Sequence, residues 1–505
     1  MKIKSVKKLN DENKIYPESE DSELIIGLVG AVGTDLETVK RSIIDRLKAF
    51  SYESKEIRIS TDVISTLRVI EDTEDNFKKI NTLMTEGNNL RKISQNNAIL
   101  SIAAVAQINS QREKEFDTPV PSKRRAYIIS SLKHPDEVNK LREIYADGFF
   151  LIGVYADENR RVDFLKNNKF IPADKAMELI IRDSNEGDKW GQHTRDTYEL
   201  SDFFINYTGS IDQINNDLWR ILDLLFGNPY ITPTFDEYAM FMAFSASLRS
   251  SDLSRQVGAV LTKNKNIIST GANDVPKFGG GLYWPDYTNG IIQDNEDGRD
   301  YKLGYDSNAK EKRMIIDDII NNVSLDPDDK EKLKSYLYDS SKIKDITEYG
   351  RVVHAEMEAI LACARSNINT SEGILYCTTF PCHNCAKHIV ACGIKRVVYI
   401  EPYPKSKAFD FHHDSISTPD SKNNLNHVVF EPFVGVGPRC FFNLFSIGLG
   451  VGYKIKRKDK QGNVIHWERR TGKLRMQMLP SSYIERETLS AAILAKQVEK
   501  LQNGN

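Results

Sequence analysis

The sequence lacks the features of membrane and secreted proteins. No stretch of its 505 residues comes close to the roughly 20 consecutive apolar residues that a membrane-spanning helix needs. Residues 1–21 are basic and then acidic without an apolar core, so they do not have the composition of a signal peptide. We expect a cytoplasmic protein with a mobile polar leader over residues 1–21 and no membrane among its partners.

Cysteine and net positive charge are also scarce. Six cysteines in a chain of this length do not form the disulfide framework of a small secreted domain, so metal binding is the function to test for them. Lys and Arg total 69 against 71 for Asp and Glu, which gives a net charge of −2. Because proteins that bind long nucleic acids usually carry a basic excess, we expect no stable DNA binding.

The chain is too long for one hydrophobic core, and its hydrophobic content of 40% is too high for a disordered protein. Strand-like runs alternate with helical patterns over residues 22–228, which predicts an α/β domain with a mainly parallel sheet covered by helices on both faces. The strands are predicted at 24–30, 56–60, 126–131, 149–155 and 203–207. A Gly-Asn-Pro turn at 227–229 ends this domain.

A second α/β domain is predicted over residues 232–480. It begins with a helix at 236–248 and a hairpin of strands at 256–262 and 266–271, and a long polar insert follows at 276–350. Beyond the insert, helices alternate with strands predicted at 374–377, 396–400 and 428–433. Residues 481–505 are predicted to add a C-terminal helix.

Three residues in the second domain have the spacing of a catalytic zinc site. The segment HAEMEAI (His354–Ile360) is followed about 28 residues after its histidine by PCHNC (Pro381–Cys385). Zinc binds neutral imidazole and thiolate, and a catalytic site uses three protein ligands with one position open for water. Cys382 and Cys385, three residues apart at a predicted helix start, can face one metal, and the positive end of the helix favours thiolates. We therefore predict that His354, Cys382 and Cys385 bind Zn²⁺.

Glu356 stands two residues after the histidine ligand, where a carboxylate is able to take a proton from water and deliver it to a ring nitrogen and a leaving amine. The combination H-x-E with P-C-x-x-C is the signature of zinc nucleobase deaminases. The alternative is a closed zinc site that only stabilises the fold. That alternative needs a fourth ligand and leaves Glu356 unexplained; the nearby candidates are Cys377, Cys392, His383 and His388.

With these residues, the second domain resembles the deoxycytidylate deaminase family, which has a cytidine deaminase-like α/β/α fold. The resemblance covers most of 236–410 and includes RQVGAVL (Arg255–Leu261), STGAND (Ser269–Asp274) and the run TTFPCHNCAKHIVACGIKRVVYIEPYPKSKA. It implies a hydrolase that deaminates dCMP or dCTP to dUMP or dUTP. It also implies deoxycytidine nucleotides as partners and a homo-oligomeric assembly.

The same resemblance implies that Asn273 binds the substrate. An amide at a strand end offers both a donor and an acceptor to a pyrimidine or its sugar, although an asparagine there also serves to close a turn. Lys405 and Lys407 in PYPKSK are candidates for phosphate or sugar contacts. The alternative for these two lysines is a solvated basic loop.

The whole chain resembles bacterial anti-phage dCTP deaminases with an N-terminal degenerate P-loop domain, through SLKHPDEVNKLREIYADGFFLIGVYA, YTGSIDQ and FVGVGPRCFF. This resemblance implies depletion of deoxycytidine nucleotides during infection, with restraint beforehand by the first domain or by an RNA or protein inhibitor. A housekeeping enzyme that makes dUMP would use the same site. Two other classes remain: a deaminase of cytosine or adenine in nucleic acid, which the net charge disfavours, and a regulatory NTP-binding protein without turnover.

The first domain carries a phosphate-loop pattern that departs from the working form. GLVGAVGTD (Gly27–Asp35) lies between a predicted strand and helix, but Thr34 stands where a working loop has lysine, and an aspartate follows. Without the lysine the loop lacks the cation that stabilises phosphate charge, although its backbone N–H groups still suit an anion. We expect Gly27, Gly30, Gly33 and Thr34 to serve nucleotide sensing or structure rather than efficient ATP hydrolysis. A domain without any ligand is the alternative.

The insert at 276–350 contains no Cys or His, so it cannot bring a second Cys/His zinc site. Its aromatic residues either stack on a base and cover the pocket or pack the insert onto the domain; they are Tyr283, Trp284, Tyr287, Tyr301 and Tyr305. His412 and His413 are adjacent, so at most one of them is expected to face a site. Arg160 and Arg161 are weaker candidates for phosphate contacts than the glycines, because they fit a solvated helix face.

Overall fold

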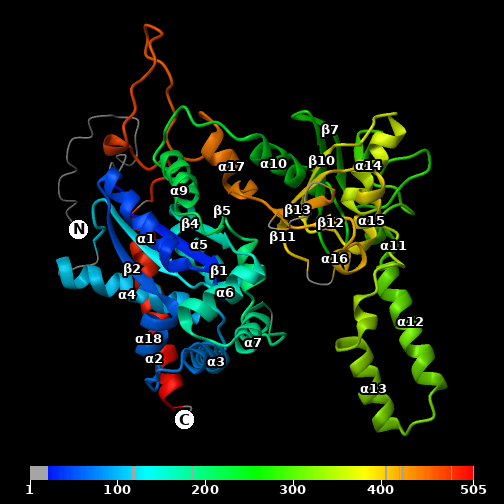
Figure 1. Ribbon diagram of the computed structural model, residues 1–505, viewed down its shortest axis with the longest axis horizontal. Coiled ribbons are helices and arrows are strands. Elements are labelled where there is room, and N and C mark those ends of the chain that lie inside the picture. The colour runs from blue at the N-terminus through cyan, green and yellow to red at the C-terminus, as the bar shows by residue number, and fades with distance from the viewer. Residues whose placement is uncertain are drawn as a thin grey trace. The chain divides into compact units, whose positions relative to one another are not determined.

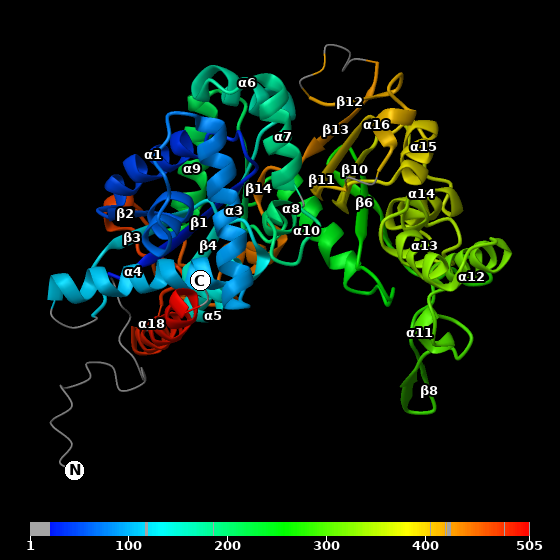
Figure 2. The ribbon, with the colours of Figure 1, turned by 90° about the horizontal axis from the view of Figure 1, so that it is seen from below.

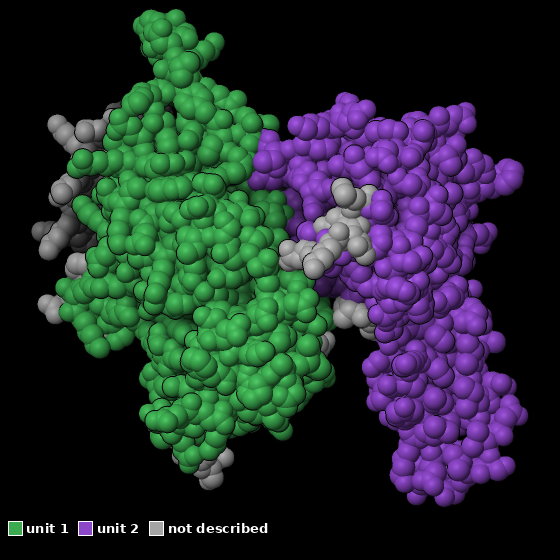
Figure 3. All heavy atoms as spheres, viewed as in Figure 1, with its two compact units in different colours: residues 1–232, 434–505 green, residues 233–433 purple. Residues whose placement is uncertain are grey.

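The computed structural model describes residues 21–116, 120–184, 186–403, 406–419, 421, 426–478 and 480–503 (Figure 1). The predicted leader, apart from its last residue, and the candidate Lys405 lie outside the described residues. The chain divides into two compact units: unit 1 comprises Met1–Thr232 and Val434–Asn505, and unit 2 comprises Pro233–Phe433 (Figure 3). None of the described helices is long and apolar enough to cross a bilayer.

The return of the chain to unit 1 at Val434 differs from the predicted second domain, which extended to residue 480. Strand β14 (Gly435–Val436) pairs antiparallel with β5 (Phe203–Asn206), so it adds an edge strand to the sheet of unit 1. The segment also supplies buried side chains to the core of that unit, among them Val436, Leu444, Leu474 and Met476. These contacts join residues more than 200 positions apart, so local patterns in the sequence do not reveal them.

The sheet of unit 1 has the order β14-β5-β4-β1-β3-β2, and its strands are parallel except for β14. The remaining strands are β1 (Leu24–Gly30), β2 (Glu53–Arg58), β3 (Arg125–Ser130) and β4 (Phe149–Tyr155). β1 is central and buried along its whole length, so the loop that follows it opens at the middle of the sheet. The predicted parallel α/β domain is therefore confirmed in its fold class.

Helices of unit 1 cover this sheet as the apolar pattern predicts. Side chains of α1 (Leu36–Leu47) and α9 (Ile211–Leu225) pack in one core with β1. The other long helices are α3 (Asn76–Ser94), α4 (Ile99–Phe116), α5 (Pro135–Tyr145), α6 (Glu158–Lys169), α7 (Ala173–Ser184), α17 (Pro438–Phe445) and α18 (Pro480–Asn503). Figure 2 shows α18 next to α4 and α5, which it contacts.

A buried ion-pair cluster attaches the C-terminal helix to the sheet. The Arg112 guanidinium on α4 donates to Glu23, which precedes β1, at 2.8 Å and also to Glu487 on α18. All three side chains are fully buried, and the Tyr483 hydroxyl donates to Glu23 at 2.7 Å. Because a buried charge is costly without partners, this network fixes α18 in place.

The sheet of unit 2 has the order β12-β13-β11-β10-β6-β7. The hairpin of β6 (Gly258–Lys263) and β7 (Asn266–Ala272) is antiparallel, whereas β10 (Ile374–Thr379), β11 (Arg396–Glu401), β12 (Ile416–Ser417) and β13 (Val428–Pro432) run parallel. β6 joins β10 antiparallel at the junction. The predicted hairpin and following strands lie within a few residues of their expected bounds.

Two glycines allow helices to approach this sheet closely on opposite faces. A Cβ at Gly258 would lie 1.9 Å from the Ala243 carbonyl oxygen of α10 (Phe235–Ser247). A Cβ at Gly271 would lie 2.0 Å from the Ala355 carbonyl oxygen of α14 (Ala355–Arg365). Side chains alternate along a strand, and Gly271 pairs with Ala259 rather than with Gly258. The two helices therefore sandwich the hairpin, which confirms the α/β/α arrangement.

The insert is more ordered than its polar composition suggests. It contains a hairpin of β8 (Asp286–Thr288) and β9 (Ile291–Gln293), the short helix α11 (Asp300–Leu303), and the paired helices α12 (Ser307–Asn322) and α13 (Pro327–Asp339). Figures 1 and 2 show α12 and α13 side by side. Asp306 and Asp326 cap them, and a proline follows Asp326, so local start signals for both helices are present in the sequence.

Candidate active site

The three predicted metal ligands come from the first turns of two helices. His354 is the N-cap of α14, Cys382 is the N-cap of α15 (His383–Ala391), and Cys385 lies in the first turn of α15. β10 ends at Thr379 and leads through Phe380 and Pro381 to Cys382, so the sheet edge sets the start of α15. Both helices thus present their positive N-terminal ends to one point, which favours thiolate.

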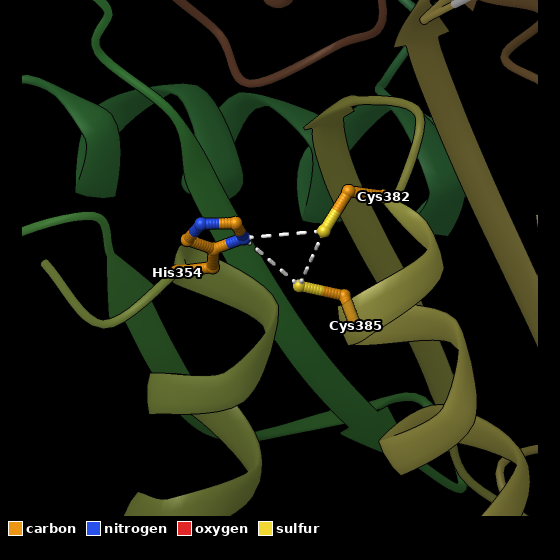
Figure 4. Close-up of side chains that lie close together, drawn as sticks. All are labelled: His354, Cys382 and Cys385. Carbon is orange, nitrogen blue, oxygen red and sulfur yellow. Dashed lines mark hydrogen bonds between the residues drawn. The ribbon is translucent and has the colours of Figure 1, made fainter. Parts of the chain in front are cut away.

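The side chains meet there at distances that fit a zinc ion (Figure 4). His354 Nδ1 lies 3.3 Å from each of the two sulfur atoms, and the sulfurs of Cys382 and Cys385 are 3.7 Å apart. A tetrahedral ion with the usual Zn–S and Zn–N bond lengths separates such N and S atoms by about 3.5 Å and two S atoms by about 3.8 Å. The three residues present therefore match the donor set and spacing that zinc requires.

No fourth protein ligand joins this group within the part of the chain that the structure describes. The nearby candidates have other surroundings: Cys377 Sγ lies 3.7 Å from the Val398 carbonyl oxygen, and His388 Nδ1 lies 2.7 Å from the Asn384 carbonyl oxygen. His383 faces Glu348. The arrangement is that of an open site, in which one coordination position is left for water or substrate.

The electrostatics of the ligands also favour a cation between them. The hydrogen bond from Cys385 lowers the pKa of Cys382 to about 4, with His354 as a further cause. The hydrogen bond between His354 and Cys382 raises the pKa of His354 to about 9. The hydrogen bond between Cys385 and Cys382, together with burial, raises the pKa of the Cys385 thiol well above its ordinary value. Cys382 is therefore the thiolate of the three ligands. A bound zinc ion would stabilise this thiolate in place of the protons that the ligands share.

Glu356 lies beside the ligands in the first turn of α14 and is only 4% exposed. Burial raises the pKa of its carboxyl group, while the charge of His354 opposes that rise. A raised pKa lets the carboxyl hold a proton more readily than an exposed glutamate does, which suits a group that accepts a proton and passes it on.

His354, Glu356 and Cys382 line one cavity of about 220 Å³. The approach to β6 and the end of β7 contribute Asp252, Ser254, Arg255, Val257 and Asn273. The insert contributes a second wall, made of Asp300, Asp306, Ser307, Asn308, Thr347 and Gly350. Asn308 links the two parts of that wall, because its Nδ2 donates to the Ile346 carbonyl at 2.8 Å. The polar insert is thus part of the pocket and not a remote addition.

Asn273 lines the cavity as predicted, and its amide also holds the backbone in place. Its Oδ1 accepts the Val257 N–H at 2.6 Å, and its Nδ2 donates to the Arg255 carbonyl at 2.8 Å. An amide has four hydrogen-bonding positions, so two remain for a ligand. The structural and the substrate-binding interpretations of Asn273 are therefore compatible.

Of the two lysines proposed for phosphate contacts, the structure describes only Lys407. Its side chain is 55% exposed, pairs with Asp410 at 2.9 Å and does not line the cavity. Arg255 does line the cavity, pairs with Glu401 and lies 5.9 Å from the Tyr403 ring centroid. No role was predicted for Arg255, although it opens the hairpin motif RQVGAVL; its place directly before the hairpin was the available signal.

The insert aromatics and the paired histidines do not line the cavity. Trp284 lies 3.6 Å below the Arg249 guanidinium, and the Tyr301 hydroxyl donates to Asp294 at 2.9 Å. The Trp284 contact joins the insert to the domain and fits the packing alternative, whereas the Tyr301 bond lies within the insert. His412 caps the short helix α16 (Ala408–Phe411) at its C-terminal end.

The phosphate-loop residues of unit 1 are placed differently from one another. Gly30, Gly33 and Thr34 line a second cavity, of about 500 Å³, whereas Gly27 lies inside β1 and does not. A Cβ at Gly27 would lie 2.8 Å from the side chains of Leu132 and Phe149, so this glycine is required for packing. Gly33 has a φ of +88°, a backbone conformation that glycine adopts without the steric cost that other residues have there.

Comparison with known proteins assigns unit 2 to a class. Residues 233–401 match the model of the cytidine and deoxycytidylate deaminase zinc-binding region. The deoxycytidylate deaminase of Enterobacteria phage T4 is 34% identical over 167 residues, which cover 33% of this chain and 77% of the phage protein. That of Schizosaccharomyces pombe is 30% identical over 199 residues, covering 38% of this chain and 47% of the yeast protein.

Among solved structures, the dCMP deaminase of cyanophage S-TIM5 in complex with dCMP and dUMP aligns with 40% of this chain and all of the cyanophage chain. It shares 22% identity, with a TM-score of 0.22. The match of residues 233–401 to the family model and the ligand geometry define a zinc-binding deaminase domain. The sequence relatives then fix the family: the chain belongs to the deoxycytidylate deaminase family of hydrolytic enzymes.

The ligand geometry predicts the metal content of the purified protein. We expect about one zinc ion per chain, and less than about 0.1 per chain in the His354→Ala and Cys382→Ser variants, because two ligands alone do not retain zinc against buffer. Cys392→Ser, at the other end of α15, is the matched control and keeps its zinc. Elemental analysis by mass spectrometry measures the number of zinc ions per chain. About one zinc ion per chain in the His354→Ala protein would show that the metal binds elsewhere.

Proposed function

We propose that this protein hydrolyses the exocyclic amine of a deoxycytidine nucleotide, converting dCMP or dCTP to dUMP or dUTP, with Zn²⁺ as cofactor. The observation that carries the proposal is the buried Glu356 carboxyl in the same cavity as an open three-ligand metal group. A nucleophilic water and a proton carrier are the two requirements of hydrolytic deamination, and this cavity has a place for each.

The residues of this chain have distinct roles in the proposed reaction. A zinc ion held by His354, Cys382 and Cys385 would supply an activated water as the nucleophile. Glu356 takes a proton from that water and places it on N3 of the pyrimidine, which makes C4 electrophilic. After the water oxygen bonds to C4, Glu356 takes the remaining proton from that oxygen and delivers it to the amine. The C4–N bond then breaks, ammonia leaves, and the product carries a carbonyl at C4.

A free nucleotide, rather than a base in nucleic acid, fits the chain best as substrate. The relatives reported above are named deoxycytidylate deaminases. The net charge of −2 offers no general attraction to a polyanion, whereas Arg255, the one arginine or lysine among the described residues of the cavity wall, suits a terminal phosphate. Lys407 would contact outer phosphates only if its loop moved toward the cavity, and Lys405 stays a candidate for the same role.

We further propose the biological setting that the whole-chain resemblance implies. A dCTP-directed enzyme would deplete deoxycytidine nucleotides during phage infection, and unit 1 or an RNA or protein inhibitor would restrain it beforehand. A homo-oligomer in the cytoplasm belongs to the same proposal. The housekeeping alternative predicts a preference for dCMP, so the ratio of kcat/KM for dCTP and dCMP separates the two.

Replacement of Glu356 tests the chemistry. Glu356→Gln keeps the size of the side chain but removes proton transfer, so kcat on the preferred deoxycytidine nucleotide should fall by about 10²–10⁴-fold while zinc content is unchanged. Glu358→Gln is the matched control: the carboxylate of Glu358 is two residues along the same helix, is 7% exposed and pairs with Arg365 outside the cavity. Ammonia release measures both, and an active Glu356→Gln enzyme would refute the assigned role.

Replacement of Arg255 tests the phosphate contact. Arg255→Met should raise KM for dCMP about tenfold, through loss of a charge-assisted hydrogen bond to phosphate. Binding of deoxycytidine, measured by competition, should change less than about twofold because it has no phosphate to lose. Lys407→Met provides the comparison; if it raises KM for dCMP and Arg255→Met does not, the phosphate lies over the 403–407 loop instead.

A further inference from the structure

The cavity of about 500 Å³ in unit 1 lies where open parallel sheets bind ligands. It opens at the carboxyl ends of β1 and β3, and its walls include the loop 30–35, residues of α3 and residues of α6. The reaction proposed for unit 2 uses none of these residues. Because its loop lacks the usual lysine, the ligand of this cavity has to be inferred from the other residues around it.

A carboxylate of the protein itself already occupies the anion-binding groups of the loop. Asp183, near the end of α7, is fully buried. Its Oδ2 accepts the Val32 backbone N–H at 2.7 Å, and its Oδ1 accepts the Lys133 ammonium at 2.8 Å. A loop N–H and an ammonium group are the donors that a strand-to-helix loop offers to a phosphate. Asp183 thus stands in the chemical position of a bound anion.

Lys133 restores the cation that the loop sequence lacks. It follows β3 in the sequence, yet its Nζ donates to the Gly30 carbonyl at 2.8 Å and so lies on the loop that follows β1. An ammonium group has three N–H donors, and two are accounted for by Gly30 and Asp183. A cation from a neighbouring strand therefore serves the loop in place of the residue at position 34.

The rest of the cavity wall is suited to an anion. Basic side chains outnumber acidic ones along it: Lys40, Arg58, Lys79, Arg91, Lys133 and Lys169 against Asp35 and Glu37. Four of the basic residues pair with carboxylates of unit 1: Lys40 with Glu37 and Glu56, Arg91 with Glu137, Lys133 with Asp183, and Lys79 with Asp72. Arg58 and Lys169 have no carboxylate partner among the described residues, so their charges attract an anion into the cavity.

Two buried oxygen atoms in the wall have no hydrogen-bond partner among the described residues. They are Thr34 Oγ1 and Gln192 Oε1, and these two residues are 9% and 6% exposed. Buried polar atoms are nearly always hydrogen-bonded in folded proteins. A donor from Thr34 and an acceptor from Gln192 beside the same loop therefore indicate a polar ligand, independently of the charge argument.

We propose that this cavity binds the polyphosphate group of a nucleotide, and that its terminal phosphate replaces the Asp183 carboxylate at the Val32 N–H and the Lys133 ammonium. The proposal deepens the predicted anion-binding role of Gly30, Gly33 and Thr34. It does not depend on the deaminase reaction. Asp183 is a tethered competitor: it satisfies the loop when the ligand is absent and lowers the affinity for the ligand when it is present.

Calorimetric titration of the full-length protein with inorganic tripolyphosphate, ATP and adenosine, in excess Mg²⁺, tests the proposal. Asp183→Asn keeps the shape of the side chain but removes its charge, so it should bind tripolyphosphate and ATP at least about tenfold more tightly than wild type. Lys133→Met should weaken both. Asp223→Asn is the matched control, because Asp223 is also a buried ion-paired aspartate of unit 1, held by Arg469 outside the cavity; its affinity should equal that of wild type.

Several results would overturn the proposal: no binding of either phosphate compound to wild type and Asp183→Asn, unchanged or weaker binding by Asp183→Asn, or binding of adenosine as tight as that of ATP. If Asp183→Asn does not fold, amide exchange on the wild type replaces it. Saturating tripolyphosphate should then alter exchange at Val32, and Lys133→Met should abolish that change; unaltered exchange at Val32 would be a contradiction. Loss of deaminase activity affects none of these readouts, so the two proposals fail separately.

Discussion

The active-site region of unit 2 depends on the meeting of two helix N-termini at the edge of a sheet. His354 is the N-cap of α14 and Cys382 is the N-cap of α15, so the caps and first turns of both helices place imidazole, two sulfurs and the Glu356 carboxyl around one point. That meeting requires α14 to lie flush against β7. Gly271 permits it, because any side chain there would overlap the Ala355 carbonyl, one residue before Glu356. The close packing of α14 on the sheet at Gly271 thus also sets the position of Glu356.

The chemistry of this site was predictable because it is local in sequence. The ligands and Glu356 occupy two short segments, and the hairpin that carries Asn273 is also local. The spacing of the residues and the period of the apolar pattern were therefore sufficient to predict the metal ligands and the hairpin. The walls of the cavity were not predictable. Asp300, Asn308 and Thr347 reach it from an insert whose weak apolar pattern hid two helices, and Lys407, favoured by its charge, lies outside the cavity on an exposed loop.

The fold shows the same division between local and distant signals. Strand β4 has its predicted bounds because a continuous apolar run marks a buried parallel strand, whereas β2 begins three residues before its predicted start, and a π-helix over Ile59–Val63 occupies its predicted end. The return of residues 434–505 to unit 1 and the contact of Asp183 with Val32 link distant positions. The lack of the usual lysine is evident in the sequence, but the contact of Lys133 with the Gly30 carbonyl is visible only in three dimensions.

The central claim is that water replaces the amine of a deoxycytidine nucleotide in the cavity of His354, Glu356 and Cys382. Incubation of the zinc-loaded protein with dCMP and with dCTP in ¹⁸O-labelled water, followed by mass spectrometry of the product, tests it directly. The account predicts a uracil nucleotide with one ¹⁸O at C4 and one ammonia released per product. Unchanged substrate in both reactions, or a product without label at C4, would contradict it.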